Sequence, residues 1–384
     1  MRWLIDRRLL AKRWLTISMC FMLLLTTAFA QDKCDPESTL ALATDEFNAG
    51  HFYGLEAILK PCISNKTFTK EQLVRAYQLL TQTYLILENP AAAEESYLNL
   101  LSANPEYVSN PERDPIDVVY LSKKFTATPI FSWFAHASGN ITLPRVIEDN
   151  EINVGSRQQY TIKPRWSAGG GVIWNYNDKL TAELGLDFSS NTFGYYEDEI
   201  FIDDNLTMTE NQLSLQMPFS IKYTHVRQGL SPYGYAGISG SLLLSSNQSF
   251  LLVDRTPGAT ASEGLEQSSE FELNNRFRRD AINRAAHIGA GFRWKYKLDY
   301  LFVDLRYSFG LNNIVRNDNS VRDVNDIFPS SVSAFKAGYI DDYFRLDQAM
   351  ITIGYIKPIY KPRKLKRART TRGVLKDVKS KSNE

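Results

Sequence analysis

The stretch LFVDLRYSFGL, residues 301–311, decides the fold class. Apolar side chains occupy its odd positions (Leu301, Val303, Leu305, Tyr307, Phe309, Leu311), and Phe302, Asp304, Arg306, Ser308 and Gly310 occupy the even ones. Successive side chains of a β-strand point to opposite faces, so this period of two predicts a strand with one apolar and one mostly polar face.

The same alternation recurs along the C-terminal two thirds of the chain, for example over residues 180–188, 213–223, 287–296 and 348–355. We expect eight strands near residues 130–143, 160–176, 179–189, 206–224, 231–245, 283–297, 300–313 and 342–358. The weakest are the first and the fifth, where glycines blur the pattern. The connections between the eight expected strands alternate between long and short, which is typical of an outer-membrane barrel.

Aromatic residues gather at corresponding ends of these strands. One girdle comprises Trp174, Tyr176, Tyr223, Trp294, Tyr296 and Tyr355, and the other comprises Trp166, Phe188, Phe309 and Phe344. A water-soluble sandwich gives no reason for this alignment, whereas a membrane barrel places aromatics at both interfaces. Residues 130–360 are therefore predicted to form an antiparallel transmembrane β-barrel of about eight strands, whose apolar face meets lipid.

The opposite, polar face then lines the lumen and carries charges of both signs. We expect these side chains to pair with one another, because isolated buried charges are costly. Eight strands leave an interior just wide enough for side chains, so the barrel is predicted to be plugged. The predicted lumen network comprises Glu183, Asp187, Lys222, Arg293, Lys295, Asp304, Arg306 and Asp347.

The first thirty residues predict export. A basic segment containing Arg2, Arg7 and Lys12 precedes an apolar run over residues 15–29, and Ala28-Phe29-Ala30 forms a small-x-small cleavage site. A membrane anchor is the alternative. Removal of residues 1–30 as a signal peptide leaves two cysteines, Cys34 and Cys62. An even pair in an exported chain predicts a disulfide, against the alternative of two buried thiols.

Residues 31–104 show helical periodicity. The segment from Ala76 to Pro105 resembles a tetratricopeptide (TPR) hairpin: Ala76 and Ala93 are small, Tyr84 and Tyr97 are bulky, and Pro105 ends the second helix. Thr69 with Gln72 marks a helix start. Cys34 and Cys62 fall at adjoining ends of the preceding hairpin, so a bridge there is geometrically natural. Residues 105–129 are expected to be a proline-rich connector with a short helix around Val118 and Leu121.

The formal net charge of +1 conceals a segregation of charge. Residues 361–384 carry a net charge of +8, and residues 31–129 carry −6. We expect this basic periplasmic tail to attract acidic partners, with plain solvation as the alternative and no role in nucleic-acid binding for an exported chain. Its predicted contact residues are Lys361, Arg363, Lys364, Lys366, Arg367, Arg369 and Arg372.

The sequence predicts no catalytic, cofactor or metal site. No nucleophile-elbow, zinc or phosphate-loop motif is present. His136 and Ser138 share one strand face, which we interpret as lumen packing. Glu197, Asp198, Glu199, Asp203 and Asp204 predict a solvated acidic loop between Ser190 and Asn205.

This order of parts resembles the PorT-like outer-membrane β-barrel proteins of Bacteroidota, some of which carry a TPR-like head. The residues that carry the resemblance are the segment from Ala76 to Pro105, the proline connector and strands such as GGGVIW (169–174) and ITIGY (351–355). It implies an α+β chain in the outer membrane. The even number of expected strands, with the long connections outside, places both termini in the periplasm.

For the function, the sequence supports a non-enzymatic scaffold. In this hypothesis the barrel, held in outer-membrane lipid, anchors periplasmic protein interactions of the head and tail, of the kind that a secretion or envelope-assembly complex requires. The alternative is a surface-binding module that acts through long extracellular loops, the longest running from Ser245 to Arg279.

Overall fold

The computed structural model describes residues 34–148, 157–198, 204–227, 229–254, 267–316 and 341–365. The expected signal peptide, residues 1–30, lies outside these ranges. The chain divides into two compact units. One contains the residues up to Thr128 together with those from Tyr360 onward, and the other runs from Pro129 to Ile359.

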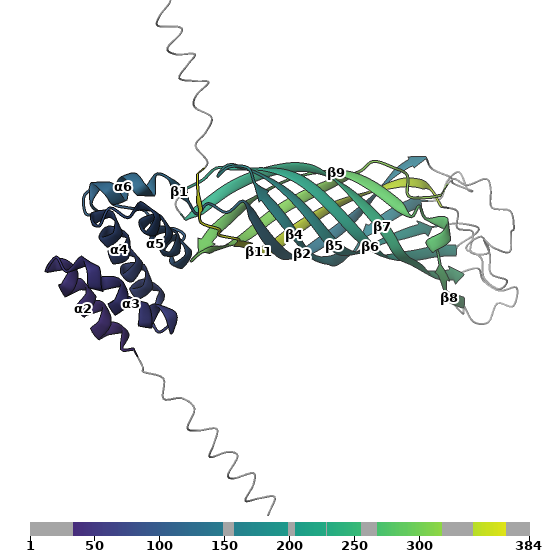
Figure 1. The fold of residues 1–384 in the computed structure, drawn as a ribbon. Coiled ribbons are helices and arrows are strands. Elements are labelled where there is room, and N and C mark those ends of the chain that lie inside the picture. Colours follow the sequence, from purple (N-terminus) through teal and green to yellow (C-terminus); the bar gives the residue numbers. More distant parts are fainter. Residues whose placement is uncertain are drawn as a thin grey trace, which may run out of the picture. The chain divides into compact units, whose positions relative to one another are not determined.

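The first unit is helical and contains α2 (Pro36–Asn48), the short η1 (Phe52–Gly54), α3 (Leu55–Ser64), α4 (Lys70–Ile86), α5 (Pro90–Ala103) and α6 (Ile116–Ser122) (Figure 1). Side chains cap three of these helices. At α4, Thr69 and Gln72 form the reciprocal capping box, as the sequence predicts. Asp35 and Asn89 cap α2 and α5, each followed by a proline at the first helical position.

The predicted disulfide between Cys34 and Cys62 is confirmed: it joins Cys34, two residues before α2, to buried Cys62 in the last turn of α3, with their Cα atoms 5.4 Å apart. Around it, Ala43 of α2, Leu55 and Leu59 of α3, and Leu79 of α4 form one apolar cluster. The bridge therefore fixes the entrance of the first helical pair to its exit.

The expected connector is folded into this helical unit. Leu121 of α6 and Phe125 pack with Tyr97 and Leu100 of α5 in a second apolar cluster. Phe125–Thr126 form β1, which pairs antiparallel with β12 (Arg363–Lys364). The prediction of a proline-punctuated linker over 105–129 missed this strand, because two residues are too few to show alternation.

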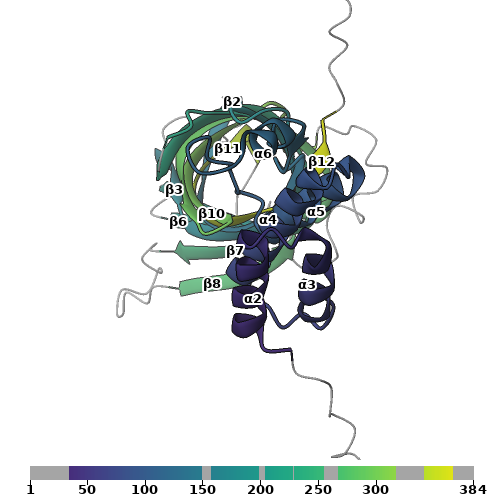
Figure 2. The same cartoon turned by 60° about the vertical axis from the view of Figure 1, so that its left-hand side comes forward.

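The second unit is a sheet of β2 (Phe131–Glu148), β3 (Arg157–Ile162), β4 (Pro164–Asn175), β5 (Leu180–Asp198), β6 (Asp204–Thr224), β7 (Leu230–Asp254), β8 (Gln267–Asn274), β9 (Ile282–Tyr296), β10 (Asp299–Gly310) and β11 (Tyr343–Pro358). The short η2 (Arg276–Arg278) lies between β8 and β9. Antiparallel pairing follows the order β4-β2-β11-β10-β9-β7-β6-β5, and β5 pairs β4 again, so these described strands form a ring (Figure 2).

The ring is apolar outside and polar inside. Large apolar side chains such as Leu184, Phe219, Leu305 and Ile353 are exposed on its outer surface. The alternate positions, including Asp187 and Asp304, are buried inside. This polarity is the reverse of a soluble sandwich and is that of a barrel whose solvent is lipid. Among the described helices, none is long and apolar enough to cross a membrane.

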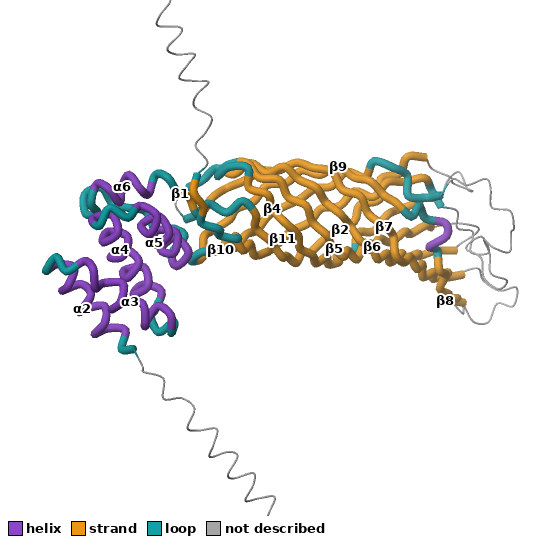
Figure 3. Tube along the Cα trace, viewed as in Figure 1, coloured by secondary structure: helices purple, strands orange, loops and turns teal. Residues whose placement is uncertain are grey.

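Several strands continue farther than their sequence pattern indicates (Figure 3). β5 reaches Asp198 and β6 begins at Asp204, so the expected loop from Ser190 to Asn205 is mostly a hairpin of two strands. Glu199 and Asp203 lie outside the described residues. Similarly, β7 extends to Asp254 and pairs with β8, which fills part of the loop expected from Ser245 to Arg279.

Candidate functional site

The barrel lumen is the candidate site, and it is filled in layers. At the end with the short turns, five side chains that point inward form an apolar cluster: Phe134, Ile173, Tyr233, Phe302 and Ile356, each at most 6% exposed. Sequence reasoning missed this layer, because it treated the inward rows as polar. The apolar cluster removes water from the charged groups above it.

The next layer holds opposite charges in contact. Lys222 Nζ donates to Glu183 Oε2 at 2.8 Å and lies 4.5 Å from the ring centre of Tyr233. Asp304 accepts hydrogen bonds from the hydroxyls of Tyr233 (2.9 Å) and Tyr235 (3.0 Å). Lys222 and Glu183 thus form an ion pair and Asp304 is hydrogen-bonded, as buried charges require.

Asp187 lies at the centre of the same layer and is fully buried. Its two oxygens face Arg306 Nη2 at 3.6 Å and His136 Nε2 at 3.5 Å. The Arg306 guanidinium also contacts the sulfur of Met350. The structure therefore brings together five of the predicted lumen residues: Glu183, Asp187, Lys222, Asp304 and Arg306.

A histidine–serine pair occurs in the lumen, but not the one on a single strand face. His287 Nε2 and Ser220 Oγ lie 2.8 Å apart, and both residues are buried. Ser138 instead donates to Thr352, 3.0 Å away. The described residues contain no group of three or more potential metal ligands.

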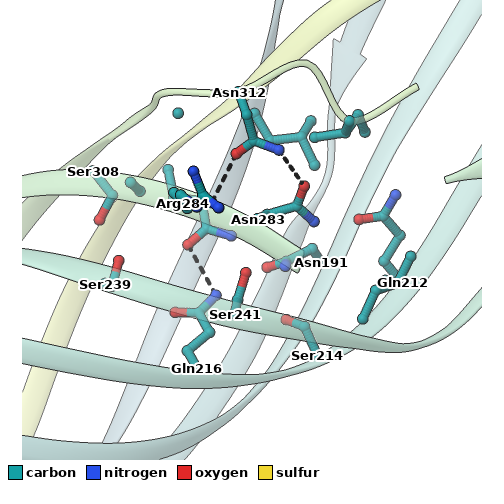
Figure 4. A pocket seen from close by; sticks show the side chains of 16 residues that line it. Asn191, Gln212, Ser214, Gln216, Ser239, Ser241, Asn283, Arg284, Ser308 and Asn312 are labelled. Atoms are coloured by element: carbon teal, nitrogen blue, oxygen red, sulfur yellow. Dashed lines mark hydrogen bonds between the residues drawn. The ribbon is translucent and has the colours of Figure 1, made fainter. Parts of the chain in front are cut away.

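A small polar cavity follows, between the charged layer and the far end (Figure 4). Its inward-pointing lining consists largely of amides and hydroxyls: Asn191, Gln212, Ser214, Gln216, Ser239, Ser241, Asn283, Ser308, Asn312 and Gln348. Arg284 contributes to the wall from a position on β9 whose side chain is exposed. Among the described lining residues no ionised side chain points inward, so this chamber suits water or another neutral polar solute.

The far end is closed by side chains of the ring strands together with two residues from outside them, Arg279 and Asp341. Arg279, which precedes β9, is completely buried and donates to Glu210 Oε1 and Oε2 (2.9 and 2.6 Å) and to Asp341 Oδ1 (2.7 Å). An apolar cluster that includes Phe193, Met208 and Phe344 surrounds this triad. The segments before β9 and β11 are thereby held to β6. Arg279 and Glu210 were not predicted, because neither falls in an alternating segment that the sequence singled out.

Three predicted lumen residues lie apart from this charged layer, two of them, Arg293 and Lys295, still on the inward row of β9 that carries His287. Arg293 contacts the face of Tyr300 at 5.0 Å, near the short turns. Lys295 is exposed toward the end of β9. Asp347 shares the outward row of β11 with Ile351 and Ile353, where it contacts Arg145 and Tyr307. Because every second residue of a strand faces the same side, Asp347 faces outward with these isoleucines and does not join the lumen network.

Phe344 is a further correction. The sequence placed it in the outer aromatic girdle, yet it is completely buried within the barrel, because it shares the inward row with Gln348 and Met350. The other members of that girdle, Trp166, Phe188 and Phe309, are exposed outside as expected.

Only the beginning of the basic tail is described, and it contacts the helical unit. Lys364 Nζ donates to both carboxylate oxygens of Glu94 on α5, at 2.5 and 2.7 Å. Arg363 donates to the carbonyl of Thr128. Lys361 is exposed. The remaining predicted tail residues, Lys366, Arg367, Arg369 and Arg372, lie outside the described ranges.

Comparison with known proteins agrees with this geometry. Residues 136–316 match a family model described as "Outer membrane protein beta-barrel domain". With the outward apolar surface, the match assigns the strand unit to the class of bacterial outer membrane β-barrels. The chain's location is accordingly the outer membrane. No curated protein matches the chain.

Solved outer membrane proteins are similar only at low identity. OprG from Pseudomonas aeruginosa is 11% identical with a TM-score of 0.31, over 62% of this chain and 99% of that chain. The protease OmpT from Escherichia coli is 10% identical with a TM-score of 0.31, over 61% and 98%. Neisserial surface protein A is 10% identical with a TM-score of 0.28, over 60% and 97%. None of these similarities carries a functional assignment.

Proposed function

We propose that the barrel is a non-enzymatic anchor that fixes a TPR-like protein-binding head and a basic tail to the periplasmic side of the outer membrane. The observation that carries this proposal is the composition of the helical unit, which combines residues 34–128 with residues 360–365 from beyond the last barrel strand. The two ends of the barrel segment thus enter one folded body, which suits a scaffold.

The lumen supports an anchoring role over transport. Its charges are compensated within the barrel, and apolar clusters lie toward both ends. The His287–Ser220 pair is buried between these layers, where a lipid or peptide substrate has no approach. These features support a barrel that is a plugged support and not an enzyme.

The head offers the surface for a partner. Tyr53, Val108 and Ile116 are among its exposed large apolar side chains. Its acidic character favours a partner segment with basic and apolar residues, and helical repeats commonly bind peptides or helices. The expected partner is a periplasmic protein, within a secretion or envelope-assembly complex of the kind that the PorT-like resemblance implies.

The alternative function is surface binding at the opposite end of the barrel. The observation that favours it is the continuation of β5, β6 and β7 as long strands, with β8 added at the edge. Such strands form a firmer platform than loops.

Affinity purification from solubilised outer membranes distinguishes the two functions. The anchor proposal predicts that removing residues 31–128 abolishes recovery of the partner, while barrel insertion is retained. A matched variant with the β7–β8 connection, residues 255–266, replaced by a short Gly/Ser linker should retain the partner. If the second variant loses the partner and the first keeps it, the anchor proposal is wrong and surface binding is supported.

A further inference from the structure

Two arginines occupy directly opposed positions on the outer face of the barrel. β2 and β11 pair Arg145 with Arg345, at the end of the barrel away from the short turns. The inward rows of these strands carry Thr142 and Gln348, which are buried, so the alternate positions 145 and 345 face outward. Directly opposed side chains have Cβ atoms about 5 Å apart. The two guanidinium groups are therefore neighbours on the membrane-facing surface.

Among the described residues, Asp347 is the carboxylate that contacts this arginine pair. Asp347 Oδ1 lies 3.4 Å from Arg145 Nη2. The same oxygen accepts the backbone N–H of Gly310 at 2.9 Å, and Oδ2 accepts the Tyr307 hydroxyl at 3.2 Å. Asp347 is only 4% exposed, so it cannot turn toward the second arginine without giving up these bonds.

Among the described residues, none compensates the charge of Arg345. Its side chain forms no ion pair or hydrogen bond with any part of the chain that the structure describes, and its Nε is shielded from solvent. Like charges directly opposite each other on a sheet destabilise it. The cluster thus carries a net charge of +1 and unused guanidinium donors, which calls for an anionic ligand.

The position of the cluster indicates where that ligand is anchored. Toward the short turns, the same outward rows become apolar, with Leu305 on β10 and Ile351 and Ile353 on β11, all more than half exposed. The rings of Tyr307 and Phe309, 4.7 Å apart, lie beside Asp347 at this boundary. Aromatic residues of barrels gather at the level of the lipid headgroups. The arginines therefore lie where headgroup phosphates are found.

We propose that Arg145 and Arg345 form a binding site for the phosphomonoester headgroup of a membrane lipid. A guanidinium presents two parallel N–H donors that match two oxygens of one phosphate. A terminal phosphomonoester offers three oxygens, enough for two arginines, whereas the phosphate of a zwitterionic diester lipid is flanked by its own cation. The lipid chains extend over the adjacent apolar rows.

The test uses the full chain in neutral detergent micelles, with native mass spectrometry counting bound lipid. The probes are a short-chain phosphatidic acid, a phosphatidylcholine of equal chain length, and inorganic phosphate. We expect one phosphatidic acid to be retained in preference to phosphatidylcholine. Each arginine near an anionic lipid contributes about a fivefold factor. R345Q should therefore weaken retention about fivefold, and R145Q/R345Q more than tenfold.

Arg284 supplies the matched control. It is an exposed outward arginine near the same end of β9, but it is opposed by Gly240 and not by a second arginine. R284Q should leave phosphatidic acid binding unchanged, and R345K should retain most of it. Equal retention by R145Q/R345Q and the wild type would overturn the proposal, as would equal loss in R284Q. Inorganic phosphate that competes at the same concentration as phosphatidic acid would overturn the assignment to a lipid.

Discussion

At the scale of single residues, Lys222 shows how the lumen holds charge. Its ammonium group contacts Glu183 and lies within 5.5 Å of the ring centres of Tyr233, Tyr235 and Phe302. Ring faces attract cations, so the apolar layer below also contributes electrostatically. A lysine is thereby accommodated in an interior that has little room for water.

Replacing Lys222 by Met should therefore destabilise the barrel by about 3 kcal/mol, because Glu183 is left as an uncompensated buried charge. Combining Lys222→Met with Glu183→Gln should restore most of this loss, since both charges are then removed. Urea unfolding in micelles measures both values. Equal destabilisation by the single and the double variant would show that the ion pair is not the source of the effect.

In the head, Tyr84 and Glu56 form a hydrogen bond between α4 and α3, with the hydroxyl donating to Oε2 at 2.7 Å. Burial and this contact raise the pKa of Tyr84 to about 12. The same bond, with help from Lys60, lowers the pKa of Glu56. A depressed carboxyl pKa contributes stability that is present above its unfolded value and is lost as the pH falls through the folded value.

Tyr84→Phe should lower the free energy of unfolding of the helical unit by about 1 kcal/mol at pH 7, a value reduced by the exposure of Glu56. The difference from wild type should shrink below about pH 4, where Glu56 is protonated. The difference should also shrink above pH 10. There the unfolded tyrosine ionises before the folded one, so the wild type loses the stability that its raised tyrosine pKa reflects. Denaturation followed by helical circular dichroism at pH 3, 7 and 11 measures this; a difference independent of pH would contradict it.

The sequence predicted which face of the barrel a side chain occupies where the alternation is strict. It did not do so near the ends of strands. Glu183, Asp304 and Arg306 lie in unbroken alternating segments, and the structure places them inside. Phe344 and Asp347 adjoin a register irregularity at Tyr343/Phe344, and residue type alone suggested the wrong face for each. An aromatic residue can fill a lumen as well as a girdle, so parity is the better guide.

At the scale of elements, β1 and β12 form a two-stranded clasp within the helical unit. Besides the strand pairing, Leu365 N–H donates to the carbonyl of Lys124 at 2.7 Å. Lys364 and Glu94 are partly exposed, so their ion pair contributes only about 1 kcal/mol or less. The tail is therefore attached at its base by several weak contacts, which the charge asymmetry alone did not reveal.

Lys364→Glu should open this clasp, because it sets two carboxylates against each other. In this variant we expect faster amide exchange at Thr126 and at residue 364. In the wild type, added salt should speed amide exchange at these two positions more than in the helices. Glu94→Lys in the same chain should restore protection by reversing the pair. Unchanged exchange in Lys364→Glu would show that the backbone pairing alone holds the clasp.

The disulfide was predictable because its evidence is local: two cysteines, an exported chain and adjoining helix ends. It closes a loop with a sequence separation of 28, which on the chain-entropy model stabilises the helical unit by about 3–4 kcal/mol. Non-reduced mass analysis should find no alkylatable thiol in the mature chain. Reduction should lower the unfolding midpoint of the helical signal and leave that of the barrel unchanged; a shift of both would mean that the units unfold together.

Strand extensions were less predictable for a physical reason. Beyond the membrane the outer surface of a strand is solvated, so the apolar row that announces it disappears. The upper part of β5, Ser190–Asp198, contains Phe193 and Tyr195 on its inward row and mixed residues outside. The sequence there has aromatic and acidic residues at close spacing, which is equally typical of a loop.

At the scale of the whole chain, two separate apolar clusters close the barrel lumen, one after the other along its length. The cluster around Phe134 and Phe302 lies toward the short turns, the cluster around Phe344 and Arg279 lies toward the far end, and paired charges lie between them. The sequence predicted a plugged lumen from strand number and charge pairing. It did not predict that apolar side chains complete the closure, because they share the parity of polar residues.

Reconstituted in planar bilayers, the full chain should give no steady conductance, since an ion would have to cross both apolar clusters. Two closures in series also predict how variants behave. Phe302→Ala with Phe134→Ala weakens one cluster, and Phe344→Ala with Phe193→Ala weakens the other, so either pair alone should remain closed. All four substitutions together should give small, frequent openings, because ions can then reach the charged layer and the neutral chamber from either side. If one double variant alone conducted as much as the fourfold variant, a single apolar cluster would be the barrier to ions. A large steady channel in the unaltered chain would contradict the packed lumen itself.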